Sequence, residues 1–126
     1  MFDEAGQINY WKSLAVEDIE TAEILLDKNK LRECLFFCHL CIEKILKAHY
    51  VKVKKDIAPK THNLIYLQRE SKISLEIENI NFLTFLMLYQ LEGRYPDYKV
   101  MIPPKEETKE KFNQTKELLQ WLIKIF

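Results

Sequence analysis

The sequence contains very little glycine and proline, with two glycines and four prolines among 126 residues. Turn-rich all-β folds use both residues at their tight turns, so this scarcity disfavours such a fold. The two glycines are isolated, which excludes a glycine-rich phosphate-binding loop, and no GxSxG nucleophile motif is present. Any phosphate bound by this chain must therefore be held by Lys, Arg or His side chains.

The chain also has no net charge, because nineteen basic residues balance nineteen acidic ones. The overall charge therefore predicts no nucleic-acid partner, although it allows a local basic patch. The longest uncharged run, residues 79–91, is shorter than the roughly twenty residues needed to span a bilayer. The first ten residues are acidic and lack the apolar region of a signal peptide. We expect a cytoplasmic protein without membrane contact.

Only three cysteines occur, and they lie close together at Cys34, Cys38 and Cys41. Their spacing on one predicted helix is too short for a disulfide framework. Together with His39 they raise the question of a metal site. Structural zinc sites, however, usually draw ligands from at least two elements, and no CxxC knuckle is present. We expect reduced, buried thiols, with no metal and no cofactor.

Apolar residues recur at helical spacing through the stretch 34–50, which we expect to be the central helix of the fold. The fold class predicted is all-α: an up-and-down helical bundle of four long helices plus one short helix, in a single domain over residues 1–126. Thr61 is the predicted N-cap of the short helix. The predicted helices span residues 8–27, 31–54, 62–70, 75–92 and 105–125.

The predicted helix 75–92 is apolar nearly all the way round toward its end. A helix of this kind needs two packing partners. Either it lies at the centre of the bundle, or one of its sides meets a second subunit.

Arg94 follows this apolar helix and is one of only three arginines in the chain. Tyr95 and Tyr98 flank it, and arginine beside aromatic rings is suited to binding phosphate and stacking on bases. The simpler interpretation is that Arg94 forms a structural ion pair, with Glu43 as a candidate partner, while both tyrosines pack on the end of the bundle.

Four segments follow one another along the chain: Trp11 with Ala15, Glu17 and Asp18; the stretch CIEKILKAHY at 41–50; Thr61-His62-Asn63-Leu64; and Gly93-Arg94-Tyr95-Pro96-Asp97. Together they resemble the HEPN family, whose name stands for higher eukaryotes and prokaryotes nucleotide-binding. The resemblance implies a helical bundle with a short extra helix, a homodimer with a cleft near its interface, and a minimal nucleotidyltransferase partner.

Many members of that family are ribonucleases of toxin–antitoxin systems, in which an arginine is followed four to six residues later by a histidine. This chain departs from that pattern, because no histidine occurs after His62. A metal-independent ribonuclease needs an acid–base group, and histidine is the usual choice near neutral pH. The departure favours a module that is not an enzyme.

The leading hypothesis is a non-catalytic module that binds a nucleotide (ATP or GTP) and acts with the nucleotidyltransferase partner in a toxin–antitoxin or defence context. One alternative is a metal-independent RNase toxin that acts on RNA through His62 or His49 beside Arg94. Another is a purely structural dimeric assembly subunit. In the leading hypothesis, lysines and the arginine contact phosphate, a tyrosine stacks on the base, and the remaining side chains orient the cations. The candidate nucleotide-binding residues are Glu43, Lys44, Lys47, His62, Arg94, Tyr95 and Tyr98.

Overall fold

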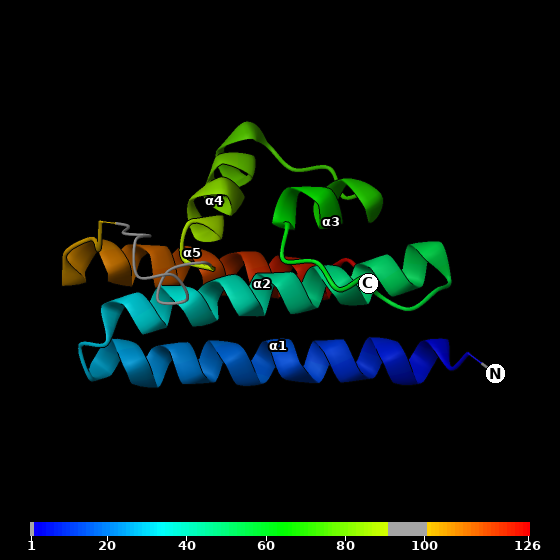
Figure 1. The fold of residues 1–126 in the computed structure, drawn as a ribbon, viewed down its shortest axis with the longest axis horizontal. Helices are drawn as coiled ribbons and strands as arrows, with labels where there is room; N and C mark the ends of the chain where they lie inside the picture. Colours follow the sequence, from blue (N-terminus) through cyan, green and yellow to red (C-terminus); the bar gives the residue numbers. More distant parts are fainter. Residues whose placement is uncertain (1, 91–100) are drawn as a thin grey trace.

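The computed structural model describes residues 2–90 and 101–126, which form five helices (Figure 1). Two long helices of 24 residues each, α1 (Glu4–Asp27) and α2 (Leu31–Lys54), are joined by a short turn. The short helix α3 (Leu64–Glu70) and then α4 (Ile77–Met87) follow, and α5 (Lys105–Lys124) completes the described chain. The predicted all-α class is confirmed.

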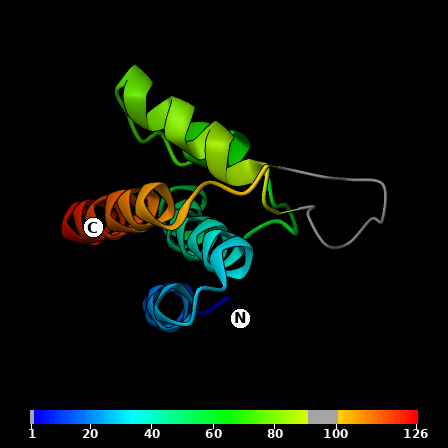
Figure 2. The same cartoon turned by 90° about the vertical axis from the view of Figure 1, so that its left-hand side faces the viewer.

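The helix α2 is the central element, because it contacts α1, α3, α4 and α5. Seen end-on, α2 and α5 lie side by side, α1 packs against one side of this pair, and α4 lies on the opposite side (Figure 2). The α1 and α2 helices run antiparallel, and α5 runs in the same direction as α2 (Figure 1). The sequence-based prediction that the stretch 34–50 occupies the centre of the fold is therefore confirmed.

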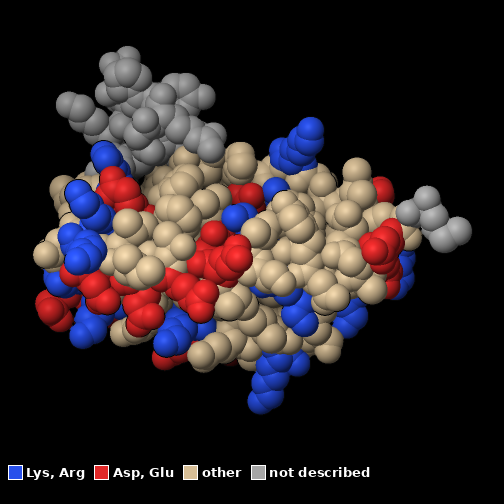
Figure 3. Space-filling model, turned by 90° about the horizontal axis from the view of Figure 1, so that it is seen from below, with Lys and Arg blue, Asp and Glu red and all other residues tan. Residues whose placement is uncertain are grey.

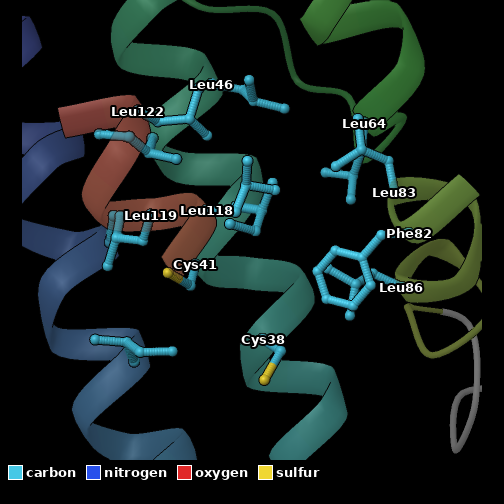
Figure 4. Close-up of a cluster of buried hydrophobic side chains, with 14 of the residues drawn as sticks. Cys38, Cys41, Leu46, Leu64, Phe82, Leu83, Leu86, Leu118, Leu119 and Leu122 are labelled. Carbon is cyan, nitrogen blue, oxygen red and sulfur yellow. The ribbon is translucent and has the colours of Figure 1, made fainter. Parts of the chain in front are cut away.

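The core forms where the apolar stripes of these helices meet on α2. The side chains of Phe82, Leu83 and Leu86 point from α4 toward α2, while Leu118 and Leu122 approach from α5 (Figure 4). All five are less than 6% exposed. Small side chains on α1 and α2 let these two helices pack closely. They are Ala15, Ala22, Cys34, Cys38, Cys41 and Ala48, each fully buried.

The three cysteines are free thiols in this core, as predicted. Burial raises the pKa of the Cys41 thiol, and a hydrogen bond with Cys34 together with burial raises the pKa of Cys38. Both thiols therefore stay protonated near neutral pH, which makes them unreactive packing groups. Among the described residues no cluster of His, Cys, Asp and Glu is arranged to hold a metal ion.

Helix boundaries differ from the prediction where a side chain caps the backbone. The α1 helix begins four residues early at Glu4, because the Asp3 carboxylate accepts a hydrogen bond from the Gly6 N–H at 2.9 Å. The predicted N-cap Thr61 is wrong. Asn63 caps α3 by accepting from the Tyr66 N–H, and the Thr61 hydroxyl instead accepts from the Asn63 N–H.

The alternative that places α4 at the centre of the bundle is also wrong, because α2 occupies that place. The α4 backbone lies against α2 and α3, and α5 reaches α4 through Lys111, whose Nζ lies 4.9 Å from the centroid of the Phe85 ring. It is shorter than expected within the described chain, ending at Met87. Its first residue, Ile77, is 68% exposed, and Leu88 just after its end is 42% exposed. One side of α4 therefore packs on the core while apolar side chains at both ends face outward. None of the described helices is both long and apolar enough to cross a membrane.

His49, near the end of α2, secures the C-terminal end of α5. Its Nε2–H donates to the Leu122 carbonyl at 2.7 Å, and its ring stacks on Phe126 at 3.9 Å between centroids. The last carbonyls of a helix lack intrahelical donors, so this imidazole satisfies one of them. His49 is only 4% exposed, and burial lowers its pKa. The neutral ring is thus the form that the fold accommodates.

We expect this histidine to make the protein less stable in mild acid. A lowered folded-state pKa means that below about pH 6.5 the unfolded chain binds the proton more readily. The free energy of unfolding should then fall with decreasing pH, by at most about 1.4 kcal/mol per pH unit, until the folded-state pKa is passed. Urea unfolding of the wild type and of His49→Gln at several pH values measures this. The glutamine can still donate to Leu122 but does not titrate.

The wild-type stability should decline more steeply than that of His49→Gln as the pH falls from about 7 to about 5. All other titratable groups are common to both proteins, so their effects cancel in the comparison. Parallel pH profiles for the two proteins would contradict the lowered pKa of His49.

Candidate functional site

A cluster of buried polar groups lies on α2, beside α1 and the segment that leads into α3. Its centre is Glu43, which is only 3% exposed. One carboxylate oxygen, Oε1, accepts a hydrogen bond from His62 Nδ1 at 2.9 Å, and Oε2 accepts one from Lys47 Nζ at 3.1 Å. Because a buried carboxylate is costly unless it is paired, these two donors are what allow Glu43 to lie inside the protein.

His62 forms the outer part of this cluster, with 45% of its side chain exposed. Since Nδ1 donates to Glu43, the ring orientation is set and Nε2 is the remaining nitrogen that can exchange a proton or bind a ligand. The backbone of His62 is held as well, because His39 Nε2–H donates to its carbonyl at 3.1 Å. His39 Nδ1 also lies 3.8 Å from Glu43 Oε1. His39 and Glu43, both on α2, thus hold the segment that leads into α3.

Lys47 is held on two sides. Its ammonium pairs with Glu43 and lies 5.1 Å from the centroid of the Trp11 ring of α1, within the range of a cation–π interaction. Its side chain is 7% exposed. Lys44 takes a different direction and forms an ion pair with Asp18 of α1, with Nζ 2.7 Å from Oδ2. Lys44 therefore links α2 to α1, and Lys47 lies between the Glu43 carboxylate and the Trp11 ring of α1.

Asp18 is the acidic member that the sequence-based analysis did not select. It is 7% exposed, and burial raises its pKa although the Lys44 ammonium opposes this effect. Its position was visible in the sequence, because Asp18 interrupts the apolar stripe formed by Ala15, Ile19 and Ala22 on α1. A carboxylate inside such a stripe needs a cation on the facing helix.

The structure brings Glu43, Lys47 and His62 into direct contact and places Lys44 in a neighbouring ion pair with α1. The remaining candidates, Arg94, Tyr95 and Tyr98, lie outside the described residues. The RNase alternative named His49 as well as His62. His49 is buried against Phe126 and donates to Leu122, so it is not available for acid–base chemistry.

Charge on the surface is mixed. On the α1 side of the molecule, acidic and basic side chains of the described chain lie interspersed (Figure 3). This distribution matches the zero net charge and gives no extended basic face there. A ligand phosphate would therefore be recognised by a few positioned groups instead of a broad positive potential.

These observations define an all-α domain whose central helix carries a buried Glu43–Lys47 pair in contact with the half-exposed His62. The chain matches the family model described as HEPN domain over residues 8–126, and it therefore belongs to the HEPN domain family. Its fold is similar to the crystal structure of an archaeal HEPN homologue, with a TM-score of 0.67 and 21% sequence identity. That similarity covers 91% of this chain and 93% of the other. Among curated proteins, none matches this chain.

Proposed function

We propose that this HEPN domain is a non-catalytic nucleotide-binding module in which His62 contacts a phosphate group. The observation that carries the proposal is the Glu43–His62 contact of 2.9 Å, which fixes a half-exposed imidazole above a buried carboxylate. When both ring nitrogens are protonated, Nδ1–H donates to Glu43 and Nε2–H is free to donate to a phosphate oxygen. Hydrogen bonds between ionised groups of this kind are among the stronger ones in proteins.

In this proposal, Lys44 and Lys47 hold other parts of the site in place and do not contact the phosphate themselves. Each ammonium already has a carboxylate partner, and breaking a buried ion pair is costly. Lys47 holds the Glu43 side chain in place beneath His62, and Lys44 holds α1 against α2. Direct cationic contact with phosphate is assigned to Arg94, and base stacking to Tyr95 or Tyr98.

We also propose that the module acts as a homodimer with a minimal nucleotidyltransferase partner, in a toxin–antitoxin or defence context. This part rests on the family membership and on the apolar residues at both ends of α4, where Ile77 and Leu88 face outward. Removing such residues from water is the usual driving force of subunit association. Sedimentation of the purified protein tests the dimer, and co-purification with the product of a neighbouring gene tests the partner.

Nucleotide affinity measured by equilibrium dialysis with ATP, at low and moderate salt, tests the binding proposal. We expect weaker binding at higher salt, and a loss of roughly tenfold or more in Arg94→Ala and in His62→Gln. The matched control is Arg69→Ala, which removes an exposed arginine of α3 and should bind as the wild type does. Binding that is absent, or indifferent to salt and to both substitutions, would contradict the proposal.

The same Glu43–His62 contact favours one alternative, a metal-independent RNase. A carboxylate that fixes one imidazole nitrogen leaves the other to accept a proton from a ribose 2′-OH, which is general base catalysis. This alternative predicts RNA cleavage that survives EDTA and is lost in His62→Gln. Intact RNA after incubation with concentrated wild-type protein would exclude it.

A further inference from the structure

A groove of about 550 Å³ separates the start of α4 from the C-terminal half of α5. Its lining residues all differ from those of the Glu43 cluster. Gln114, Glu117, Leu118 and Trp121 follow one another at helical spacing on one face of α5. Ser74, Leu75, Glu76 and Asn79 form the opposite wall. The volume lies in the range of about 300–1,000 Å³ that is typical of ligand sites.

The groove has an apolar floor and an aromatic wall. Leu118 is 5% exposed and belongs to the core, so it closes the bottom of the groove. Trp121 is 41% exposed even though tryptophan is usually well covered in a folded domain. Its ring therefore presents a large apolar and electron-rich surface to whatever enters the groove.

Among the described residues, the charged groups that line the groove are both carboxylates, Glu76 on one wall and Glu117 on the other. Neither forms an ion pair with a cation among residues 2–90 and 101–126. Elsewhere in the described chain, Asp18, Glu43 and Glu70 are each paired with a lysine. Two unpaired carboxylates facing one concave space produce a negative potential inside it.

A tryptophan face combined with carboxylates and an apolar floor is suited to a long side chain that ends in a cation. The apolar stem packs on Leu118 and Leu75, the cation lies over the Trp121 ring, and Glu76 or Glu117 supplies the counter-charge. Arginine fits better than lysine, because its planar guanidinium can stack on the indole and donate to a carboxylate in two places. The Asn79 and Gln114 amides can bond the backbone of the incoming segment.

We propose that this groove binds an arginine-bearing peptide segment of a partner protein. The charge complementarity and the exposed Trp121 carry the inference, and it does not depend on nucleotide binding at His62. An interaction of this kind adds a protein-docking surface on the side of the domain formed by α4 and α5.

The test uses the blocked peptide acetyl-Ala-Arg-Leu-amide and the full chain, observed by ¹⁵N–¹H NMR. The indole resonance of Trp121 is identified as the one missing from Trp121→Phe. We expect it and the amides of residues 74–79 to shift during the titration. Peptides with citrulline or norleucine in place of arginine should bind at least about tenfold more weakly, because they lack the charge.

Substitutions distinguish the effect of the two groove carboxylates on peptide binding from the effect of general surface charge. Glu76→Gln and Glu117→Gln should each weaken binding of the arginine peptide by roughly threefold to tenfold. Glu110→Gln, an exposed position of α5 outside the groove, is the matched control and should bind normally. All three positions are exposed, so these variants should fold.

Equal binding of the arginine, citrulline and norleucine peptides would overturn the proposal and indicate a purely apolar surface instead. Shifts confined to residues outside the groove, or no shift of the Trp121 indole at millimolar peptide, would overturn it as well. Because the titration contains no nucleotide, a failure here leaves the proposal for His62 unaffected.

Discussion

Replacing Glu43 with alanine is expected to lower the free energy of unfolding by about 3–5 kcal/mol. The substitution removes the acceptor for Lys47 and His62 at once, and it leaves the Lys47 ammonium, whose side chain is 7% exposed, without a counter-charge. An unpaired buried charge is among the most costly defects in a folded protein. Urea unfolding followed by circular dichroism measures the change.

Two further variants distinguish the ion pair from the packing of the side chain. Glu43→Gln keeps the shape but loses the charge, and we expect a loss of about 1–3 kcal/mol. The double variant Glu43→Met with Lys47→Met removes both charges and keeps apolar volume, so it should be more stable than Glu43→Ala. A loss of less than about 1 kcal/mol in Glu43→Ala would show that this cluster does not hold the segment before α3.

Leu46→Ala is expected to destabilise the protein by about 2–5 kcal/mol. Leu46 is fully buried on the central helix α2 and belongs to the same core cluster as Leu122 of α5 and Leu64 of α3 (Figure 4). Deleting its side chain removes apolar contacts and leaves a cavity in this core. Urea unfolding followed by circular dichroism measures this loss of stability as well.

The control for this substitution is Leu88→Ala, because Leu88 is 42% exposed and follows the end of α4. Its truncation should change the free energy of unfolding by about 0.5 kcal/mol or less in a monomer. Comparable losses at the two positions would contradict the central place of α2. A concentration-dependent loss in Leu88→Ala would instead indicate that this residue lies in a subunit interface.

The fold was predictable because apolar spacing determines which face of a helix is buried. The stripe at residues 34–50 predicted the central position of α2, and the predicted bounds of that helix, 31–54, agree with the structure. Periodicity did not determine the place of α4, which is apolar enough to occupy the centre but lies to one side of α2, against α2 and α3. It also gave no information on caps, since the hydrogen bond from the Tyr66 N–H to the Asn63 side chain depends on local backbone geometry.

The site was predictable only in part. Glu43 and Lys47 are four residues apart on one helix, which is the spacing of a helical ion pair, and the structure shows that pair. The contacts of Lys44 with Asp18 and of His62 with Glu43 join residues that are 26 and 19 positions apart. Such pairings follow from how helices pack against one another, and spacing along one helix does not reveal them.

The central claim, that His62 and its buried partners form a nucleotide site, is tested most directly by an amide-shift NMR titration with ATP and GTP at low and moderate salt. The account predicts shifts clustered at residues 43–47, 61–64 and Arg94, which weaken as salt is added. The absence of shifts at millimolar nucleotide would contradict the claim. The protein would then be a structural or partner-binding subunit.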